Sequence, residues 1–319
     1  MDLRPPAPLV SVPPTAESTA ARTRAGVAYA VAAYGLWGVF PLYFKAVSDV
    51  DLWEVVAHRI VWSLAFLSLL LAVRHAWPQV WAVLGSRRGL LTLCATTLLI
   101  AGNWVVFVWA INNRYTLHAS LGYYINPLVN VLLGYIFLRE GLRRLQLLSV
   151  GLAAVGVGYL TLSFGEFPTI ALFLALTFGL YGLLRKTAPV DAPVGLTVET
   201  ALLTPFALAL LTTRGLGGTL AFGHASLTTD LLLAAAGLVT ALPLLWFAQA
   251  ARRLRLTTMG FVQYLAPTGH FLLAVFAFRE RFDPHAHLVA FGFIWTALAL
   301  YSFDAALSTR RPAEMVPPE

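Results

Sequence analysis

The sequence predicts an all-α polytopic membrane protein with ten transmembrane helices, arranged as two inverted five-helix repeats. Two properties of the chain point to a membrane: 59% of its 319 residues are hydrophobic and only 12% are charged. A soluble domain carries about 25% charged residues, so the chain has too few charges to coat two water-exposed domains. A third observation, a repeat of residues at a fixed spacing, points to the two halves.

Apolar runs of membrane-spanning length recur between two polar tails. Residues 1–24 are rich in Pro, Ser, Thr and Arg, and we expect a disordered tail there; residues 308–319 are expected to form a second tail. A helix needs about 20 mostly apolar residues to cross a bilayer core. By that criterion, ten helices are expected at 25–44, 55–73, 89–111, 116–138, 145–163, 168–184, 193–212, 231–250, 256–278 and 286–306.

The positions of the basic residues predict the orientation of these helices. If both ends of the chain lie in the cytoplasm, sixteen of the 22 Lys and Arg residues fall in cytoplasmic segments and six in outer ones. Cytoplasmic loops carry an excess of Lys and Arg. Membrane topology therefore accounts for the net charge of +7, and we expect the lipid bilayer as a partner and no nucleic acid.

A repeat relates the first five helices to the last five. Because five is an odd number, the two copies must cross the membrane in opposite directions, which is typical of secondary transporters with a site near the membrane midplane. We place the first repeat at 25–163 and the second at 164–307. A shift of 140 residues pairs Tyr124, Pro127, Leu132, Leu133, Arg139 and Glu140 with Tyr264, Pro267, Leu272, Leu273, Arg279 and Glu280, and a shift of 144 pairs Gly35, Leu36 and Gly38 with Gly179, Leu180 and Gly182.

Polar groups inside the apolar runs are the candidate functional residues, because each is unfavourable in lipid without a partner or water. In the fourth expected helix, Gly122, Asn126, Asn130 and Gly134 are spaced by four and share one face. The matching face of the ninth helix is less polar but contains His270. This polar stripe could line a substrate path, or it could serve close packing between helices.

Two prolines occupy equivalent positions in the two repeats, Pro127 and Pro267. A proline inside a helix frees the carbonyl of the residue four positions earlier, here Tyr123 and Gln263. Freed carbonyls at membrane depth need side chains, water or a ligand. We therefore expect both prolines to break their helices beside a cavity, with a simple structural bend as the alternative.

Glu199 is the most conspicuous ionisable residue, because it lies about 9 Å into the seventh expected helix. Its counterpart in the first repeat, Glu54, has His58 and Arg59 nearby and can be neutralised locally. Glu199 lacks this help, so three roles remain open for it. It could couple transport to protons, form an ion pair between helices, or reach the cytoplasmic interface.

Further polar and aromatic residues could line an amphipathic pocket, although a single Trp or Tyr serves equally well in packing or as an interfacial anchor. They are Asn103, Tyr34, Trp37, Tyr123 and Tyr181.

Motifs for the common catalytic and metal chemistries are missing from the sequence. It contains no P-loop, HExxH or GxSxG pattern. An HxH pair, His285 and His287, has no further ligands at metal spacing, and the single cysteine, Cys94, excludes a multi-cysteine site. We therefore expect no enzyme activity, cofactor or metal.

Several long segments resemble the RarD branch of the EamA transporters, in the drug/metabolite transporter superfamily. The resemblance covers about residues 25–306 and rests on YGLWGVFPLYFK, HRIVWS, GNWVVFVWAINN, LGYYINPLVNVLLGYIFLRE and GLVTALPLLWFAQAARRLRLTTMGFVQYLAPT. It implies a bacterial inner-membrane protein with two EamA repeats, cytoplasmic termini and a central cavity. The cavity residues it implies are Trp37, Asn103, Tyr123, Asn126, Asn130, Glu199, Gln263 and His270.

The function expected from the sequence is secondary transport of a small amphipathic metabolite or drug by alternating access, with efflux favoured by the resemblance. Two alternatives remain open at this stage. One is an intramembrane enzyme acting on a lipid headgroup, which would need converging acid, base or nucleophile groups. The other is a structural or sensory membrane protein.

Overall fold

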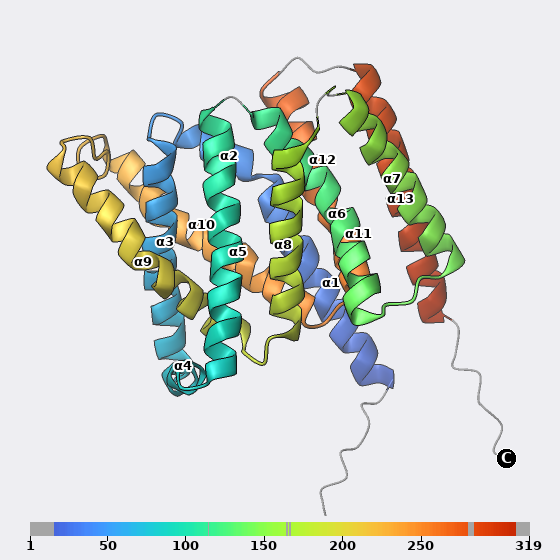
Figure 1. Ribbon diagram of the computed structural model, residues 1–319, viewed down its shortest axis with the longest axis horizontal. Helices are drawn as coiled ribbons and strands as arrows, with labels where there is room; N and C mark the ends of the chain where they lie inside the picture. Colours follow the sequence, from blue (N-terminus) through green and yellow to red (C-terminus); the bar gives the residue numbers. More distant parts are fainter. Residues whose placement is uncertain (1–15, 114, 164, 166, 280–283, 311–319) are drawn as a thin grey trace, which may run out of the picture.

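Ten long apolar spans run side by side in the part of the chain that the structure describes (Figure 1). The computed structural model describes residues 16–113, 115–163, 165, 167–279 and 284–310. Of the two expected tails, residues 1–15 and 311–319 lie outside the described residues, whereas residues 16–24 and 308–310 are helical and belong to the first and last helices. The ten candidate spans agree with the predicted ones within a few residues, which confirms the prediction of an all-α polytopic membrane protein. They are Ala20–Ala46, Leu52–Val73, Arg87–Ile111, His118–Leu138, Arg144–Ser163, Thr169–Thr187, Ala192–Leu216, Leu227–Ala251, Leu256–Ala277 and Leu288–Leu307.

Some spans contain more than one helix, and one helix lies between spans. The helices are α1 (Ala16–Gly38), α2 (Phe40–Ala46), α3 (Leu52–Val73), α4 (Trp77–Leu84), α5 (Arg87–Asn112), α6 (Thr116–Leu138), α7 (Arg144–Ser163), α8 (Thr169–Thr187), α9 (Ala192–Leu216), α10 (Leu227–Ala251), α11 (Leu256–Gln263), α12 (Leu265–Leu272), the π-helix η1 (Leu273–Ala277) and α13 (Pro284–Arg310). The first span divides at Val39, two residues before a proline, and the ninth divides at Tyr264.

The two equivalent prolines have different effects on their helices. In the ninth span, α11 ends four residues before Pro267, at Gln263. In the fourth span, α6 continues through Pro127 as one helix. The expected pair of symmetric breaks is therefore present on one side only. Both spans lie against two other helices, but the contact of α6 with α8 is more extensive than the contact of the ninth span with α1, so α6 is held in line more firmly.

Helix ends follow from short polar side chains and from backbone turns. Asp51 accepts hydrogen bonds from the first amides of α3, and Ser86 and Ser226 do the same for α5 and α10. Arg139 ends α6 and Arg279 follows η1, and these equivalent residues share a left-handed backbone, with φ of 52° and 53°. Matching backbone turns at matching positions support the relation between the two halves.

The packing of the helices is nearly unchanged when the halves are exchanged. Three pairs map onto themselves: α7 with α13, α3 with α9, and α6 with α11. Other pairs exchange with one another. For example, α6 packs on α8, and the equivalent ninth span, α11 and α12, packs on α1. The pair of α7 and α13 lies at one side of the bundle and α9 at the other (Figure 1). The two-repeat division with its boundaries remains a prediction, which this pattern supports.

Two ends of the bundle are distinguished below. The end at which the first span begins and the last span finishes is called the tail end, and the other is the far end. Helices α3 and α10 pack closely against each other because α10 has a glycine, Gly237, at their contact. A Cβ atom at this position would overlap the backbone of α3 at Trp62. Large apolar side chains such as Leu98 and Phe206 are about three-quarters exposed on the outer surface, as expected for residues that face lipid.

Candidate functional site

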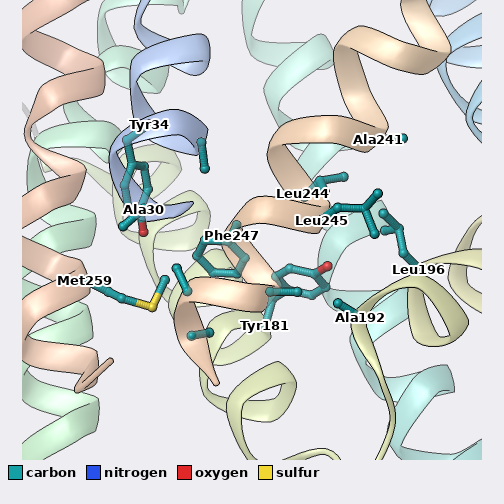
Figure 2. Close-up of a cluster of buried hydrophobic side chains, with 14 of the residues drawn as sticks. Ala30, Tyr34, Tyr181, Ala192, Leu196, Ala241, Leu244, Leu245, Phe247 and Met259 are labelled. Atoms are coloured by element: carbon teal, nitrogen blue, oxygen red, sulfur yellow. The ribbon is translucent and has the colours of Figure 1, made fainter. Parts of the chain in front are cut away.

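Five aromatic side chains form a cluster where α1, α8 and α10 meet. The ring of Phe247 is 6.2 Å from that of Tyr34, 5.8 Å from Trp37, 5.2 Å from Phe178 and 6.0 Å from Tyr181, measured between centroids. Figure 2 shows Phe247 between Tyr34 and Tyr181. These five residues, called the aromatic cluster below, fill the space between the three helices. The cluster thus brings together three of the predicted pocket residues, Tyr34, Trp37 and Tyr181.

A chain of hydrogen-bonded side chains crosses the bundle beside this cluster. Asn130 donates to Asn126 Oδ1 at 3.1 Å and to Gln263 Oε1 at 2.7 Å. Asn126 donates in turn to the carbonyl of Ala175, and the hydroxyl of Tyr34 lies 3.5 Å from Gln263 Oε1. All four side chains are buried. This amide chain links α6 with α8, α11 and α1.

The two glycines of the predicted polar stripe also lie against other residues. A Cβ atom at Gly122 would be 3.1 Å from the carbonyl of Ala171, and one at Gly134 would be 2.8 Å from Glu140 Oε2. In this conformation the whole stripe is therefore engaged in packing between helices. The amides remain hydrogen-bonding groups that a solute could use if the helices separated.

Glu199 is held inside the bundle by groups from two other helices. Its Oε1 accepts a hydrogen bond from Thr96 at 2.6 Å and lies 3.5 Å from Arg185 Nη1, and its Oε2 accepts from Tyr181 at 3.2 Å. The side chains of Glu199 and Arg185 are only 2% and 1% exposed. Of the three roles open from the sequence, the structure shows the ion pair between helices.

Arg185 is a residue that sequence reasoning missed, because the sixth expected helix stopped at 184 and the arginine was counted as part of a loop. The helix continues to Thr187, and Arg185 turns back into the bundle, where it also donates to the carbonyl of Ala192. Gly195 leaves room for its guanidinium, since a Cβ atom there would overlap it. The sequence did contain one indication of such a partner: Glu199 has no cation nearby on its own helix, so a cationic partner has to come from another helix.

The predicted residues nearer the far end form a second group of contacts. Tyr123 meets His270 edge to face, with ring centroids 5.5 Å apart, and His270 Nε2 lies 2.8 Å from the carbonyl of Trp37. Asn103 lies apart from this group and donates to the carbonyl of Leu174 and to Thr177 Oγ1. The Asn103 amide thus ties α5 to α8.

Glu54 accepts backbone hydrogen bonds through one carboxylate oxygen, while its Oε2 is buried without a hydrogen-bond partner among the described residues. Its Oε1 accepts from the amides of Ala221 and Phe222, in the connection between α9 and α10, and lies 3.8 Å from His58 Nε2. Arg59, which we expected to help neutralise it, points to other partners. Residues five apart on a helix lie about 140° apart around its axis, so the two side chains leave α3 on different faces.

The guanidinium of Arg59 lies between α3, α5, α10 and α2. It donates to Thr240 Oγ1 at 2.9 Å and lies 4.9 Å above the ring of Trp104 and 5.7 Å from that of Phe44. The side chain is buried. Sequence reasoning gave Arg59 only the role of neutralising Glu54.

A partly open cavity of about 740 Å³ is present at the tail end. Residues from α1, α3, α4, α9 and α10 line it, together with residues of the segments that flank these helices. The charged residues of its wall are Arg22, Arg74, Arg252, Arg253 and Asp191. The cavity is therefore basic.

No group of three or more His, Cys, Asp or Glu side chains that could hold a metal ion occurs in the part of the chain that the structure describes. The side chains of His285 and His287 lie outside the described ones. The described residues thus place buried amides, aromatic rings and three charged centres, at Glu199, Glu54 and Arg59, among ten apolar spans. Such an arrangement is typical of polytopic membrane proteins of the transporter class.

Comparison with known proteins identifies the family. The model of the EamA-like transporter family matches residues 24–162. Protein RarD of Salmonella typhi is 47% identical over 293 residues, which are 92% of this chain and 99% of that protein. The chloramphenicol-sensitive protein RarD of Pseudomonas aeruginosa is 34% identical over 294 residues, 90% and 97% of the two chains. The chain therefore belongs to the EamA-like transporter family, together with the RarD proteins, and is a multi-pass protein of the bacterial inner membrane.

The fold is shared with solved structures, one of which is a crystal structure. This crystal structure superposes with a TM-score of 0.68 and 18% sequence identity, and the match covers 91% of this chain and all of the other. At this identity the likeness concerns the fold alone.

Proposed function

We propose that the protein is a secondary transporter that exports small amphipathic metabolites or drugs across the inner membrane by alternating access. Membership of a transporter family supports the general function. The name of the relative from Pseudomonas aeruginosa associates that protein with chloramphenicol sensitivity, which makes chloramphenicol a compound to test here.

The observation that carries the proposal is the amide chain between the halves. Asn126 and Asn130 come from α6 and Gln263 from α11, which are the fourth and ninth spans. Buried amides are costly in a membrane protein unless they are satisfied. Here they satisfy one another, so a solute that enters between the halves can replace one set of hydrogen bonds with another. The break between α11 and α12 allows this region to bend.

The two halves would rock about this midplane region, with the aromatic cluster as the barrier on the tail side. We propose that the tail end faces the cytoplasm, because fifteen of the 22 basic residues fall in the segments expected there even when Arg185, which lies inside the bundle, is left out. The basic cavity would then be the cytoplasmic vestibule, and export would run from it past the aromatic cluster toward the far end.

Protons are the driving ion we propose, with Glu199 as the coupling residue. Protonation would remove the charge that holds Arg185, and so loosen the contact between α8 and α9. Transport by a Glu199→Gln protein at several pH values tests this role. A rate and a pH dependence equal to those of the unchanged protein would exclude it.

Solute movement by the purified protein in sealed proteoliposomes tests the proposed function as a whole. A panel of labelled amino acids, organic acids, organic cations and chloramphenicol should contain compounds that enter faster than into protein-free liposomes. Loss of this uptake in an Asn130→Leu protein that still folds would support the site. Chemical conversion of lipid or solute without movement would contradict transport.

A further inference from the structure

Arg59 is a buried cation that lacks an acidic partner within the described part of the chain. Arg185 pairs with Glu199, and Arg214, at the far end, pairs with Asp51 at 2.7 Å. The hydrogen bond described for Arg59 goes to the neutral hydroxyl of Thr240. Because an unpaired buried charge is costly, its retention inside a lipid-embedded bundle calls for a compensating role.

The surroundings of Arg59 leave most of its donors free. A guanidinium carries five N–H donors in a planar fork, and Thr240 accepts from one of them, Nε. The rings of Trp104 and Phe44 attract the charge through their faces without accepting these bonds. A cationic fork with free donors, set among aromatic rings, matches an oxyanion attached to an apolar body.

A purely structural role for Arg59 is a weak explanation. Arg59 and Thr240 do connect α3 with α10, but other contacts already join these helices. Ser63 donates to the carbonyl of Gly237 at 3.0 Å, and Gly237 lies directly against the backbone of α3. A neutral side chain at position 59 could pack there without the cost of burying a charge.

We propose that Arg59 binds the anionic group of the transported solute, a carboxylate in the simplest case, while Trp104 and Phe44 contact its apolar part. This inference rests on the proposed function and narrows its substrate class to organic anions. Helix α3 begins at the far end of the bundle, and Arg59 lies seven residues after its first residue, Leu52. At 1.5 Å per residue, Arg59 is about 10 Å inside that end and therefore at membrane depth.

The basic cavity at the tail end, whose arginines belong to the cytoplasmic excess of basic residues, would also favour an anionic solute. Four arginines and one aspartate line its wall. A concave surface with one dominant sign of charge raises the local concentration of ions of the opposite sign. An anionic solute would therefore be concentrated at the tail end before it reaches the aromatic cluster and Arg59.

Matched carboxylate and amide probes test the inference by binding. Calorimetry of the purified protein with N-acetylphenylalanine and its neutral amide should show the carboxylate binding about tenfold more tightly, as expected for charge-assisted hydrogen bonds. In Arg59→Gln the two affinities should become equal within about twofold. Arg214→Gln, which removes a paired arginine at the same end, should keep the preference.

A second variant covers the case in which Arg59→Gln does not fold. Arg59→Lys keeps the charge but loses the planar fork, so binding of the carboxylate should weaken several-fold and binding of the amide should not change. Equal changes for both probes would overturn the inference. So would a carboxylate preference that persists in Arg59→Gln, or binding of neither probe by the unchanged protein.

Transport measurements separate this inference from the proposed function. Movement of N-acetylphenylalanine that falls at least about tenfold in Arg59→Gln supports both. Movement of chloramphenicol with no preference for the carboxylate keeps the transporter and overturns the anion site. Binding of the carboxylate that depends on Arg59, without movement of any solute, keeps the anion site and contradicts the transporter.

Discussion

Replacement of Glu199 by Gln should destabilise the protein by about 3 kcal/mol, because it removes one partner of a buried ion pair. The side chains of Glu199 and Arg185 are 2% and 1% exposed, so water cannot solvate the guanidinium of Arg185 once its partner has lost its charge. Such losses range from about 3 to 5 kcal/mol. The lower value applies because Gln can still bond to Thr96 and Tyr181, and Arg185 keeps the carbonyl of Ala192.

A double-mutant cycle isolates the contribution of the pair. Denaturant or thermal unfolding in detergent would be measured for the unchanged protein, Glu199→Gln, Arg185→Met and the double variant. We expect the double variant to be more stable than the sum of the single losses predicts, with a coupling of about 2 kcal/mol or more. Additive losses, or single losses below about 1 kcal/mol, would refute the assignment of a buried ion pair.

Three further predictions concern the packing between helices. Gly237→Ala should lower the free energy of unfolding by about 1–3 kcal/mol, because the new methyl group overlaps α3. The control Gly35→Ala, whose methyl group meets no atom within 4 Å, should be neutral or stabilising. Equal unfolding temperatures of the two variants would contradict the close contact at Gly237. Asn130→Leu should cost about 1–3 kcal/mol in an unfolding titration because Gln263 loses its 2.7 Å donor; an unchanged midpoint would oppose the amide chain. The first two amides of α11 donate to the carboxylate of Glu140 at 2.7 and 2.9 Å. Glu140→Gln should therefore speed amide hydrogen exchange at the start of α11. Unchanged exchange there would show that the Glu140 carboxylate does not stabilise this helix end.

The helical framework was predictable because the bilayer imposes a simple length rule. Each span needs about 20 apolar residues, and the polar breaks between them are clear in the sequence. Details inside the spans were harder to predict. Pro127 and Pro267 are equivalent in sequence, yet only the helix that contains Pro267 is divided. Whether a proline breaks a helix depends on the neighbours that hold it, and a single sequence does not show them.

The charged centres show the same limit. Glu199 was identified because a carboxylate inside an apolar run stands out, but its partner Arg185 was assigned to a loop. The end of α8 lies three residues further than expected, and that difference places the arginine inside the bundle. Arg59 was read with its neighbour Glu54, although a separation of five residues turns the two side chains to different faces. Side-chain direction at the ends of helices is thus the least predictable part of the site.

Counterflow of a labelled solute tests the central claim, alternating access, most directly. Proteoliposomes would be loaded with unlabelled solute from the panel, such as N-acetylphenylalanine, and diluted into a trace of the labelled form. We expect the label to rise transiently above its equilibrium level, because a carrier returns across the membrane loaded with solute from the other side. Label that only equilibrates, or that stays outside as in protein-free liposomes, would contradict alternating access.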